Sequence, residues 1–277
     1  MIHFNKKVHF AALLAALLLF ATSCGSGNGA KTASSADASD ASGGTAAEST
    51  SETVLFEDGT LDFATNVTFP PYEFYEGDAM TGIDIDIAQA IGEKLGVPVK
   101  FHDMEFTNIL ASIDSGKVDA GIAGMSVTPD RLESARFSDP YTTSIQSIIV
   151  AEGSPIATAE DLAGKKIGTQ LGTTGDMYAK ENFGEENVQG FDKGADAVLA
   201  LSNGKVDAVI IDNEPAKNFV AANKGLTLLD SKYAEEEYAI ALNKTNDALL
   251  KEINAALAEL KKDGTLQAII EKYIPAK

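Results

Sequence analysis

One pentapeptide occurs twice in the chain, as Gly116-Lys-Val-Asp-Ala120 and as Gly204-Lys-Val-Asp-Ala208. Each copy follows an apolar segment with helical spacing and leads into a strand-like run, Gly-Ile-Ala-Gly in the first case and Val-Ile-Ile-Asp in the second. Glycine between a helix and a strand is common, so coincidence is the alternative explanation. Taken as matched helix–turn–strand units, the two copies predict a molecule with two similar lobes.

Strand-like runs alternate with amphipathic segments on both sides of these copies. The expected strands are residues 60–65, 97–101, 118–123, 166–169 and 206–211, and the expected helices are residues 84–95, 108–115, 174–182, 195–202 and 246–262. This alternation predicts an α/β fold in which mixed, mostly parallel sheets are flanked by helices. The folded part, residues 53–277, is also large for one hydrophobic core, which favours two lobes.

The N-terminus has the layout of a secretory signal peptide over residues 1–23, with Lys6 and Lys7 ahead of an apolar run and small residues before Cys24. The run is shorter than the roughly 20 apolar residues that span a bilayer. Cys24 lies in a segment that resembles a lipoprotein lipidation site, although Ala21 replaces the usual leucine. Ordinary cleavage that leaves an exported thiol is the alternative. Residues 24–52 are expected to comprise the cysteine that this resemblance marks for lipidation and, because they are rich in Ser, Ala, Gly and Thr, a flexible linker.

Charge and composition exclude several functions. The chain has 22 basic and 41 acidic residues, a net charge of −19, which argues against nucleic acid and anionic lipid as partners. Without the signal peptide, only Cys24 and His102 remain of the thiols and imidazoles, so disulfides, histidine-rich metal sites and thiolate chemistry are not expected. His102 falls on an alternating strand and is expected to face solvent. No metal or cofactor is predicted.

Ligands of open α/β sheets bind beyond the carboxyl ends of the strands, so the residues that follow the two pentapeptide strands are site candidates. Thr128 and Pro129 predict a helix start whose first turn carries Arg131. A guanidinium in that place can hold a carboxylate through two parallel hydrogen bonds, whereas the alternative is a surface ion pair.

The second half offers complementary groups. Residues 171–175, Leu-Gly-Thr-Thr-Gly, open a predicted helix and would aim backbone N–H groups at an anion. Asp212 ends an apolar strand, where it either faces an ammonium group or caps the helix near Pro215. Cation, anion and helix-end donors together complement a zwitterionic α-amino acid.

Four blocks in the chain resemble the signature blocks of the polar amino acid family of type II periplasmic binding proteins, the bacterial extracellular solute-binding proteins of family 3. The resemblance covers residues 61–273 and keeps the order of the blocks, which are Thr68-Phe-Pro-Pro-Tyr-Glu-Phe74, Gly82-Ile-Asp-Ile-Asp86, Gly124-Met-Ser-Val-Thr-Pro-Asp-Arg131 and Phe137-Ser-Asp-Pro-Tyr141. It implies a two-lobed fold with the ligand in the interlobe cleft.

The resemblance also implies roles for individual residues. Phe69 and Phe106 should enclose the ligand side chain, although composition alone favours core packing for both. The ligand carboxylate should be held by Ser126, Arg131, Thr174 and Gly175, and its amino group by the Gly124 carbonyl and Asp212. Asn66 and Gln170 should face the distal end of the ligand. Two neutral amides there favour a neutral polar amino acid, such as glutamine or cystine, over a basic one, while acidic and sulfur-containing ligands stay open.

The implied function is that of a substrate-binding lipoprotein of an amino acid ABC importer. It would be a monomer, held at the extracytoplasmic face of the bacterial membrane through Cys24, with an ABC permease as its partner. Lobe 1 would comprise residues 53–149 plus 239–277 and lobe 2 residues 150–238, and ligand bound between Arg131 and Asp212 would close them. An enzyme is not expected. The alternatives are a cyclohexadienyl dehydratase of the same fold and a ligand-sensing domain for a membrane partner.

Overall fold

The computed structural model describes residues 58–230 and 234–275. The predictions of a signal peptide over residues 1–23 and of a lipid-bearing linker over residues 24–52, with Cys24, lie outside these residues. In the described part, no helix has both the length and the apolar character needed to cross a membrane.

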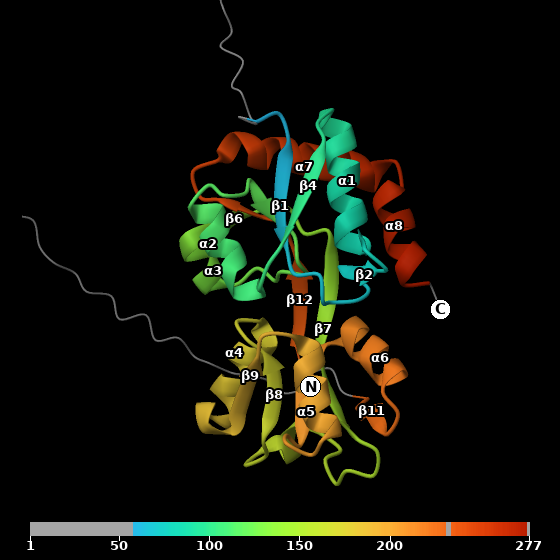
Figure 1. Cartoon of the computed structure of the whole chain (residues 1–277). Coiled ribbons are helices and arrows are strands. Elements are labelled where there is room, and N and C mark those ends of the chain that lie inside the picture. The colour runs from blue at the N-terminus through green and yellow to red at the C-terminus, as the bar shows by residue number, and fades with distance from the viewer. Residues whose placement is uncertain (1–57, 231–233, 276–277) are drawn as a thin grey trace, which may run out of the picture. The chain divides into compact units, whose positions relative to one another are not determined.

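The first lobe is built on a five-stranded mixed sheet, drawn in the upper half of Figure 1. Its strand order is β4 (Val99–Asp103), β1 (Leu61–Thr65), β5 (Ala120–Gly121), β13 (Ala241–Asn243) and β6 (Ala135–Phe137). Strand β1 runs parallel to β4 and β5, whereas β13 is antiparallel to β5 and β6. A two-stranded hairpin, β2 (Phe74–Glu76) and β3 (Ala79–Thr81), lies beside it.

Helices cover this sheet. The helix α2 (Ile109–Asp114) packs on β1, β5 and β13, and the short α3 (Pro129–Ser134) precedes β6. The other helices of the lobe pack against one another, and these are α1 (Ile83–Leu95), α7 (Asp247–Lys262) and α8 (Thr265–Tyr273). Apolar residues of α7, among them Leu249, Ile253 and Leu257, are fully buried, as the spacing of residues 246–262 predicts.

The second lobe has a six-stranded sheet. Its order is β11 (Leu226–Leu228), β7 (Thr142–Ala151), β10 (Ala208–Asp212), β8 (Ile167–Gln170) and β9 (Val188–Phe191), and β12 (Ala234–Tyr238) pairs with β7. Strand β8 is parallel to β9 and β10, and β7 is antiparallel to β10. Its helices are α4 (Thr174–Phe183), α5 (Gly194–Ser202) and α6 (Asn213–Ala222), and the chain also has 3₁₀ turns at Phe106–Asn108, Ala159–Leu162 and Glu185–Asn187.

The first passage from one sheet to the other differs from the expected boundary at residue 149. Strand β6 ends in the first sheet at Phe137, and β7 already pairs with β12 from Thr142 onward. Ile149 lies opposite Val209 inside the second sheet and is fully buried there. The apolar residues just before Ala151 are therefore buried in the second lobe and not in the first. The return passage runs between Tyr238 and Ala241.

The repeated pentapeptides adopt one geometry in both lobes. Gly116 and Gly204 have φ angles of 69° and 67°, the left-handed conformation that ends a helix at low cost in glycine. The side chain of Asp119 accepts a hydrogen bond from the backbone N–H of Asp62 at 2.8 Å. Asp207 accepts one from Lys166 at the same 2.8 Å. Each aspartate therefore ties the strand after the repeat to the neighbouring parallel strand.

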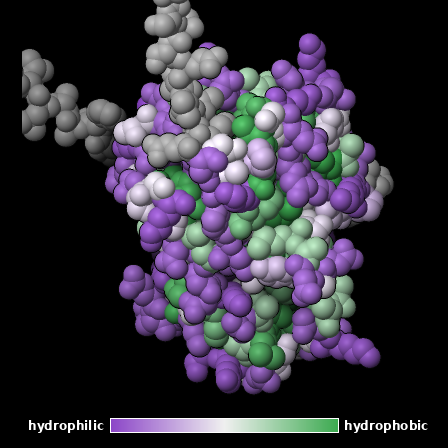
Figure 2. Space-filling model, turned by 45° about the horizontal axis from the view of Figure 1, so that its top comes forward, coloured by the Kyte–Doolittle hydropathy of each residue, from purple (hydrophilic) through white to green (hydrophobic). Residues whose placement is uncertain are grey.

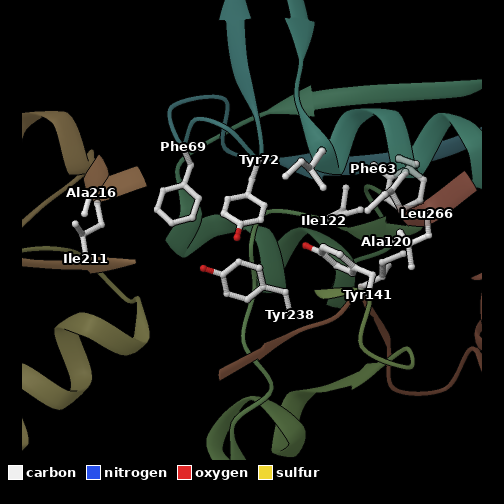
Figure 3. Close-up of a cluster of buried hydrophobic side chains, with 14 of the residues drawn as sticks. Phe63, Phe69, Tyr72, Ala120, Ile122, Tyr141, Ile211, Ala216, Tyr238 and Leu266 are labelled. Atoms are coloured by element: carbon white, nitrogen blue, oxygen red, sulfur yellow. The ribbon is translucent and has the colours of Figure 1, made fainter. Parts of the chain in front are cut away.

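An aromatic cluster joins strand β12 to the first lobe (Figure 3). The rings of Tyr72 and Tyr238 meet edge to face with centroids 5.1 Å apart, and Tyr141 lies 6.4 Å from Tyr238. Phe69 stacks on Tyr72 at 5.8 Å. The cluster holds the end of β12 against the first lobe, and its member Phe69 lines the space described next.

Candidate functional site

Arg131 lies at the start of α3, as the sequence predicts. The Thr128 hydroxyl accepts a hydrogen bond from the Arg131 backbone N–H at 3.2 Å, and Pro129 takes the first helical position. The Arg131 side chain is buried, so it does not form the surface ion pair that was the alternative. Its guanidinium donates to the Ser126 carbonyl at 2.6 Å and, across the cleft, to the Gly172 carbonyl at 3.0 Å.

The electrostatic surroundings of Arg131 are acidic. Burial lowers the pKa of its guanidinium, and the carboxyl groups of Glu236 and Asp212 act in the opposite direction. The guanidinium carbon also lies 5.2 Å from the centre of the Phe106 ring, a cation–π distance. Two of its five N–H groups bond to backbone carbonyls, so the guanidinium retains donors for a carboxylate.

Asp212 lies at the end of β10 and at the N-cap position of α6, but its side chain does not cap that helix. Its Oδ1 instead accepts from the Ser144 hydroxyl at 2.9 Å and from the Tyr238 hydroxyl. The capping alternative is therefore wrong. Burial, and then repulsion from Glu236, raise the pKa of the Asp212 carboxyl to about 6, and the hydrogen bonds from Tyr238 and Ser144 limit the rise.

Phe69 and Phe106 are both almost fully buried and face the same small space. Phe69 is also part of the aromatic cluster, which agrees with a packing role as well (Figure 3). Gly124 has a φ angle of 52°, and a Cβ atom there would lie 2.9 Å from Cε1 of Phe69. Glycine at position 124 therefore lets the backbone approach the Phe69 ring.

The two amides predicted to face the ligand's distal end come from different lobes and bond to each other. Gln170 donates through Nε2 to Oδ1 of Asn66 at 3.0 Å, and Asn66 donates to the Met104 carbonyl at 2.8 Å. Both side chains are 3% exposed. The pair therefore contributes neutral groups to the lining of the same space as Asp212.

The helix start at Thr173–Gly175 behaves as expected locally. The Thr173 hydroxyl caps α4 by accepting from the Asp176 backbone N–H at 3.3 Å. A Cβ on Gly175 would lie 2.8 Å from Oε1 of Gln146, so only glycine fits there without a shift. The Thr174 hydroxyl donates to Oε2 of Glu236 at 2.8 Å. Glu236 is not among the residues that the sequence predicts for the site.

Three acidic residues at the site are not predicted from the sequence: Glu236, Glu73 and Asp84. Glu236 is 8% exposed, and its strand alternates buried and exposed residues up to Tyr238, a period-two signal that marks it as inward-facing. Asp84 accepts from the Gly124 backbone N–H at 2.7 Å and from the Tyr141 hydroxyl at 2.9 Å. It therefore positions the Gly124 loop.

Burial raises the pKa of Asp84 to about 7. The pKa of Glu73, which lines the space beside Phe69, rises well above its usual range because of burial and then because of Asp84. Repulsion between the two buried carboxyls therefore adds to the cost of ionising Glu73.

Nine of the ten predicted ligand-binding residues line one cavity. They are Asn66, Phe69, Phe106, Gly124, Ser126, Arg131, Gln170, Thr174 and Asp212, and Gly175 lies next to Thr174 outside the lining. The cavity has a volume of about 10 Å³, room for about one water molecule, so a larger ligand requires side chains or lobes to move. Among the described residues, no group of three or more His, Cys, Asp or Glu residues is arranged to hold a metal ion. His102 lies away from this cavity, half-exposed and 2.8 Å from Asp62.

Comparison with known proteins gives matches along most of the chain. The family model described as bacterial extracellular solute-binding proteins, family 3, matches residues 61–276. The L-cystine-binding protein of Escherichia coli strain K12 is 35% identical over 224 residues, which cover 79% of this chain and 84% of that protein. The arginine-binding extracellular protein of Bacillus subtilis strain 168 is 31% identical over 218 residues, covering 77% of this chain and 85% of that protein.

Solved structures agree with these matches. An ancestral arginine-binding protein bound to glutamine is 42% identical with a TM-score of 0.76, and the match covers 79% of this chain and 99% of that one. The arginine-, lysine-, histidine-binding protein of Geobacillus stearothermophilus is 32% identical with a TM-score of 0.76, over 79% of this chain and 96% of that one.

Proposed function

The chain belongs to the bacterial extracellular solute-binding proteins, family 3, and from this premise we propose that it captures a free polar L-amino acid between its lobes for an ABC importer. The predicted family and the two-lobed type II periplasmic binding protein fold are confirmed by that match and by the solved relatives. The observation that carries the proposal is the pairing of Arg131 and Asp212, opposite charges buried on opposite lobes at one cavity.

The chemistry of the cavity fits a zwitterion. Arg131, with the hydroxyls of Ser126 and Thr174 and the Gly175 backbone, would hold the α-carboxylate. The Asp212 carboxylate and the Gly124 carbonyl would hold the α-ammonium group. An ammonium beside Asp212 removes the cost of its buried charge, which the raised pKa of about 6 reflects. Phe69 and Phe106 would enclose the side chain of the bound amino acid.

The distal amides supply the argument for ligand preference. Asn66 and Gln170 offer donors and acceptors without charge, so a neutral polar side chain can replace their mutual hydrogen bond. A guanidinium or ammonium there would gain no counter-charge from these two residues. The relatives named above bind cystine in one case and arginine in another, and we propose that this chain prefers glutamine or cystine over basic amino acids.

Lobe closure would present the loaded protein to its permease. Ligand bridging Arg131 and Asp212 binds the closed form more tightly than the open one and so shifts the population toward closure. The predicted lipid at Cys24 and the linker over residues 24–52 would hold the protein at the extracytoplasmic face of the membrane. The proposed monomeric state agrees with the small number of large exposed apolar residues in the described part of the chain, which are Tyr75, Val127, Leu132 and Leu199, and with the mixed hydropathy of the face in Figure 2.

A binding role accounts for the charged groups better than catalysis does. Arg131 and Asp212 match the charges of a ligand, and Asp84 holds the Gly124 loop. The named relatives are binding proteins associated with transport. We therefore propose that the chain is not an enzyme.

The experiment is a thermal unfolding series on the protein with each common amino acid and L-cystine, followed by circular dichroism because the chain has no tryptophan. A ligand that binds only the native state raises the midpoint. A selective rise with one neutral polar amino acid is the expected result. A rise with arginine or lysine alone would overturn the preference, and no rise with any amino acid would overturn the function.

A further inference from the structure

Glu236 holds the two hydroxyl groups that the proposed function assigns to the ligand carboxylate. Its Oε2 accepts from Ser126 Oγ at 2.6 Å and from Thr174 Oγ1 at 2.8 Å. Gln146 Nε2 adds a longer contact at 3.3 Å. Ser126 belongs to the first lobe and Thr174 to the second, so this carboxyl group joins both walls of the cavity.

Hydrogen-bond chemistry makes Glu236 and a ligand carboxylate exclude each other. A hydroxyl has one proton to donate, and both hydroxyl protons are directed at Glu236 in this arrangement. A second carboxylate at the same donors would lose those bonds and meet a like charge. We propose that Glu236 is an internal competitor that occupies the α-carboxylate position and must leave it when an amino acid binds.

The position is one that Glu236 can leave. Its other oxygen, Oε1, is buried and has no hydrogen-bond partner among the described residues, which makes the present arrangement costly. Glu236 and Ser126 also line a second hollow of about 640 Å³, together with Val127, Thr143 and Ile145. A rotamer change on β12 takes the carboxyl group into that hollow, where water can solvate it.

Because of this competition, the affinity of a ligand depends on its α-carboxylate as well as on its side chain. The proposal rests on the proposed function: a ligand that brings its own α-carboxylate replaces the bonds that Glu236 gives up. An analogue without the carboxylate leaves Glu236 in place. Glu236 therefore lowers affinity for amino acids, and its removal favours ligands that carry a carboxylate.

Calorimetric titration of the wild type, Glu236→Gln and Glu237→Gln tests the competition. The probes are L-glutamine, L-arginine and L-cystine, each beside its decarboxylated analogue: 4-aminobutanamide, agmatine and cystamine. Glu237 is exposed on the same strand and serves as the charge-matched control. Glu236→Gln should lower the Kd of the bound amino acid about five- to tenfold, because its neutral amide oxygen is a weaker acceptor for the Ser126 and Thr174 hydroxyls and removes the like charge, and it should leave the analogue's Kd unchanged. An unchanged or higher Kd for the amino acid would overturn the proposal.

Chemical rescue tests the same position without any amino acid. Glu236→Ala removes a group of the size of acetate and leaves the Ser126 and Thr174 hydroxyls without their acceptor. Sodium acetate should then raise the melting temperature of Glu236→Ala in a saturable way, relative to sodium chloride of equal ionic strength, and should not raise that of the wild type or of Glu237→Ala. Absence of that rise would refute a carboxylate position at Glu236. Acetate rescue without binding of any amino acid would keep this position and refute the proposed function instead.

Discussion

The two pentapeptide units have the same backbone geometry but end in different ways. After Gly116, strand β5 is only two residues long and gives way to a loop that carries Gly124 and Ser126. After Gly204, strand β10 runs for five residues and passes directly from Asp212 into α6. The first unit is followed by backbone groups and then by the cation Arg131 in the first turn of α3, whereas the second ends in the buried acid Asp212. A shared scaffold therefore supplies the two charges of the site through the residues that follow it.

The largest expected effect tests the cation on the first side. Arg131→Ala should raise the Kd for the bound amino acid about 100-fold or more, because it removes a buried, charge-assisted clamp for the carboxylate. Titration calorimetry measures the change. Arg136→Ala is the matched control, since Arg136 is half-exposed and pairs with the exposed Asp247 at 3.2 Å. Equal affinity for the wild type and Arg131→Ala would show that the two sides do not cooperate as described.

Buried acids on the two sides should differ in how they respond to pH. The pKa of Asp84 in the folded state is about 7, well above the 3.8 of an unperturbed aspartate, so the folded state holds a proton that the unfolded state has lost. Stability should therefore fall as pH rises from about 4 to about 7, by an amount on the order of a few kcal/mol for a group this deeply buried. Denaturant unfolding of the wild type and Asp84→Asn measures this slope, which the variant should reduce.

Asp212 should respond to ligand where Asp84 does not. Its pKa of about 6 falls when an ammonium group binds beside it, so binding releases a proton and affinity should rise as pH increases through 6. Glu236, Tyr238 and Arg131 also interact with the Asp212 carboxyl, and they are present in the free and in the ligand-bound protein. Calorimetry in buffers of different ionisation enthalpy counts the released proton. A Kd independent of pH between 5 and 7 would contradict the assignment of Asp212 to the ammonium group.

A smaller effect is expected at the loop of the first ending. Gly124→Ala should raise the Kd roughly tenfold, since the new Cβ would lie 2.9 Å from the Phe69 ring and the φ angle of 52° strains any other residue. Gly96→Ala is the control: its φ angle is 70° but no atom lies within 4 Å of the added Cβ. Gly96→Ala should lose about 1 kcal/mol of stability, Gly124→Ala should lose more because of its contact with Phe69, and only Gly124→Ala should lose affinity. Similar affinities for the two variants would contradict the proposed contact between Phe69 and the ligand.

The smallest effect tests the likeness of the units themselves. Asp119→Ala and Asp207→Ala each remove a carboxylate that accepts from a backbone N–H at 2.8 Å. Each should destabilise the protein by roughly 1–2 kcal/mol in denaturant unfolding, and by similar amounts, with little change in Kd. A loss confined to one variant would mean that the repeat is structural in only one lobe.

Much of the fold could be predicted because its signals are local. Helix punctuation at Gly116 and Gly204 and the helix start at Thr128 each depend on nearby residues. The predicted boundary at residue 149 falls inside β7: an apolar residue such as Ile149 suits either lobe, and only its pairing with Val209 decides which sheet it joins. Long-range pairing of this kind leaves little trace in a single sequence.

The site shows the same limit. Arg131 and Asp212 are predicted as site residues from their places at the ends of elements and from the resemblance. Glu236 was missed because one glutamate in a run of three looks like solvated surface, and only its bonds to Ser126 and Thr174 distinguish it. The mutual bond of Asn66 and Gln170 was equally invisible, since the two residues are far apart in the chain and meet only across the cleft.

The paired strands β7 and β12, which run side by side between the lobes in Figure 1, have a mechanical consequence. A two-stranded ribbon bends across its flat face more easily than it shears along its hydrogen bonds, so opening and closing would follow a single angular coordinate. One distance then reports that angle. A dye pair on exposed positions such as Leu199 of α5 and Glu93 of α1 would convert ligand concentration into an optical signal and make the protein a genetically adjustable sensor.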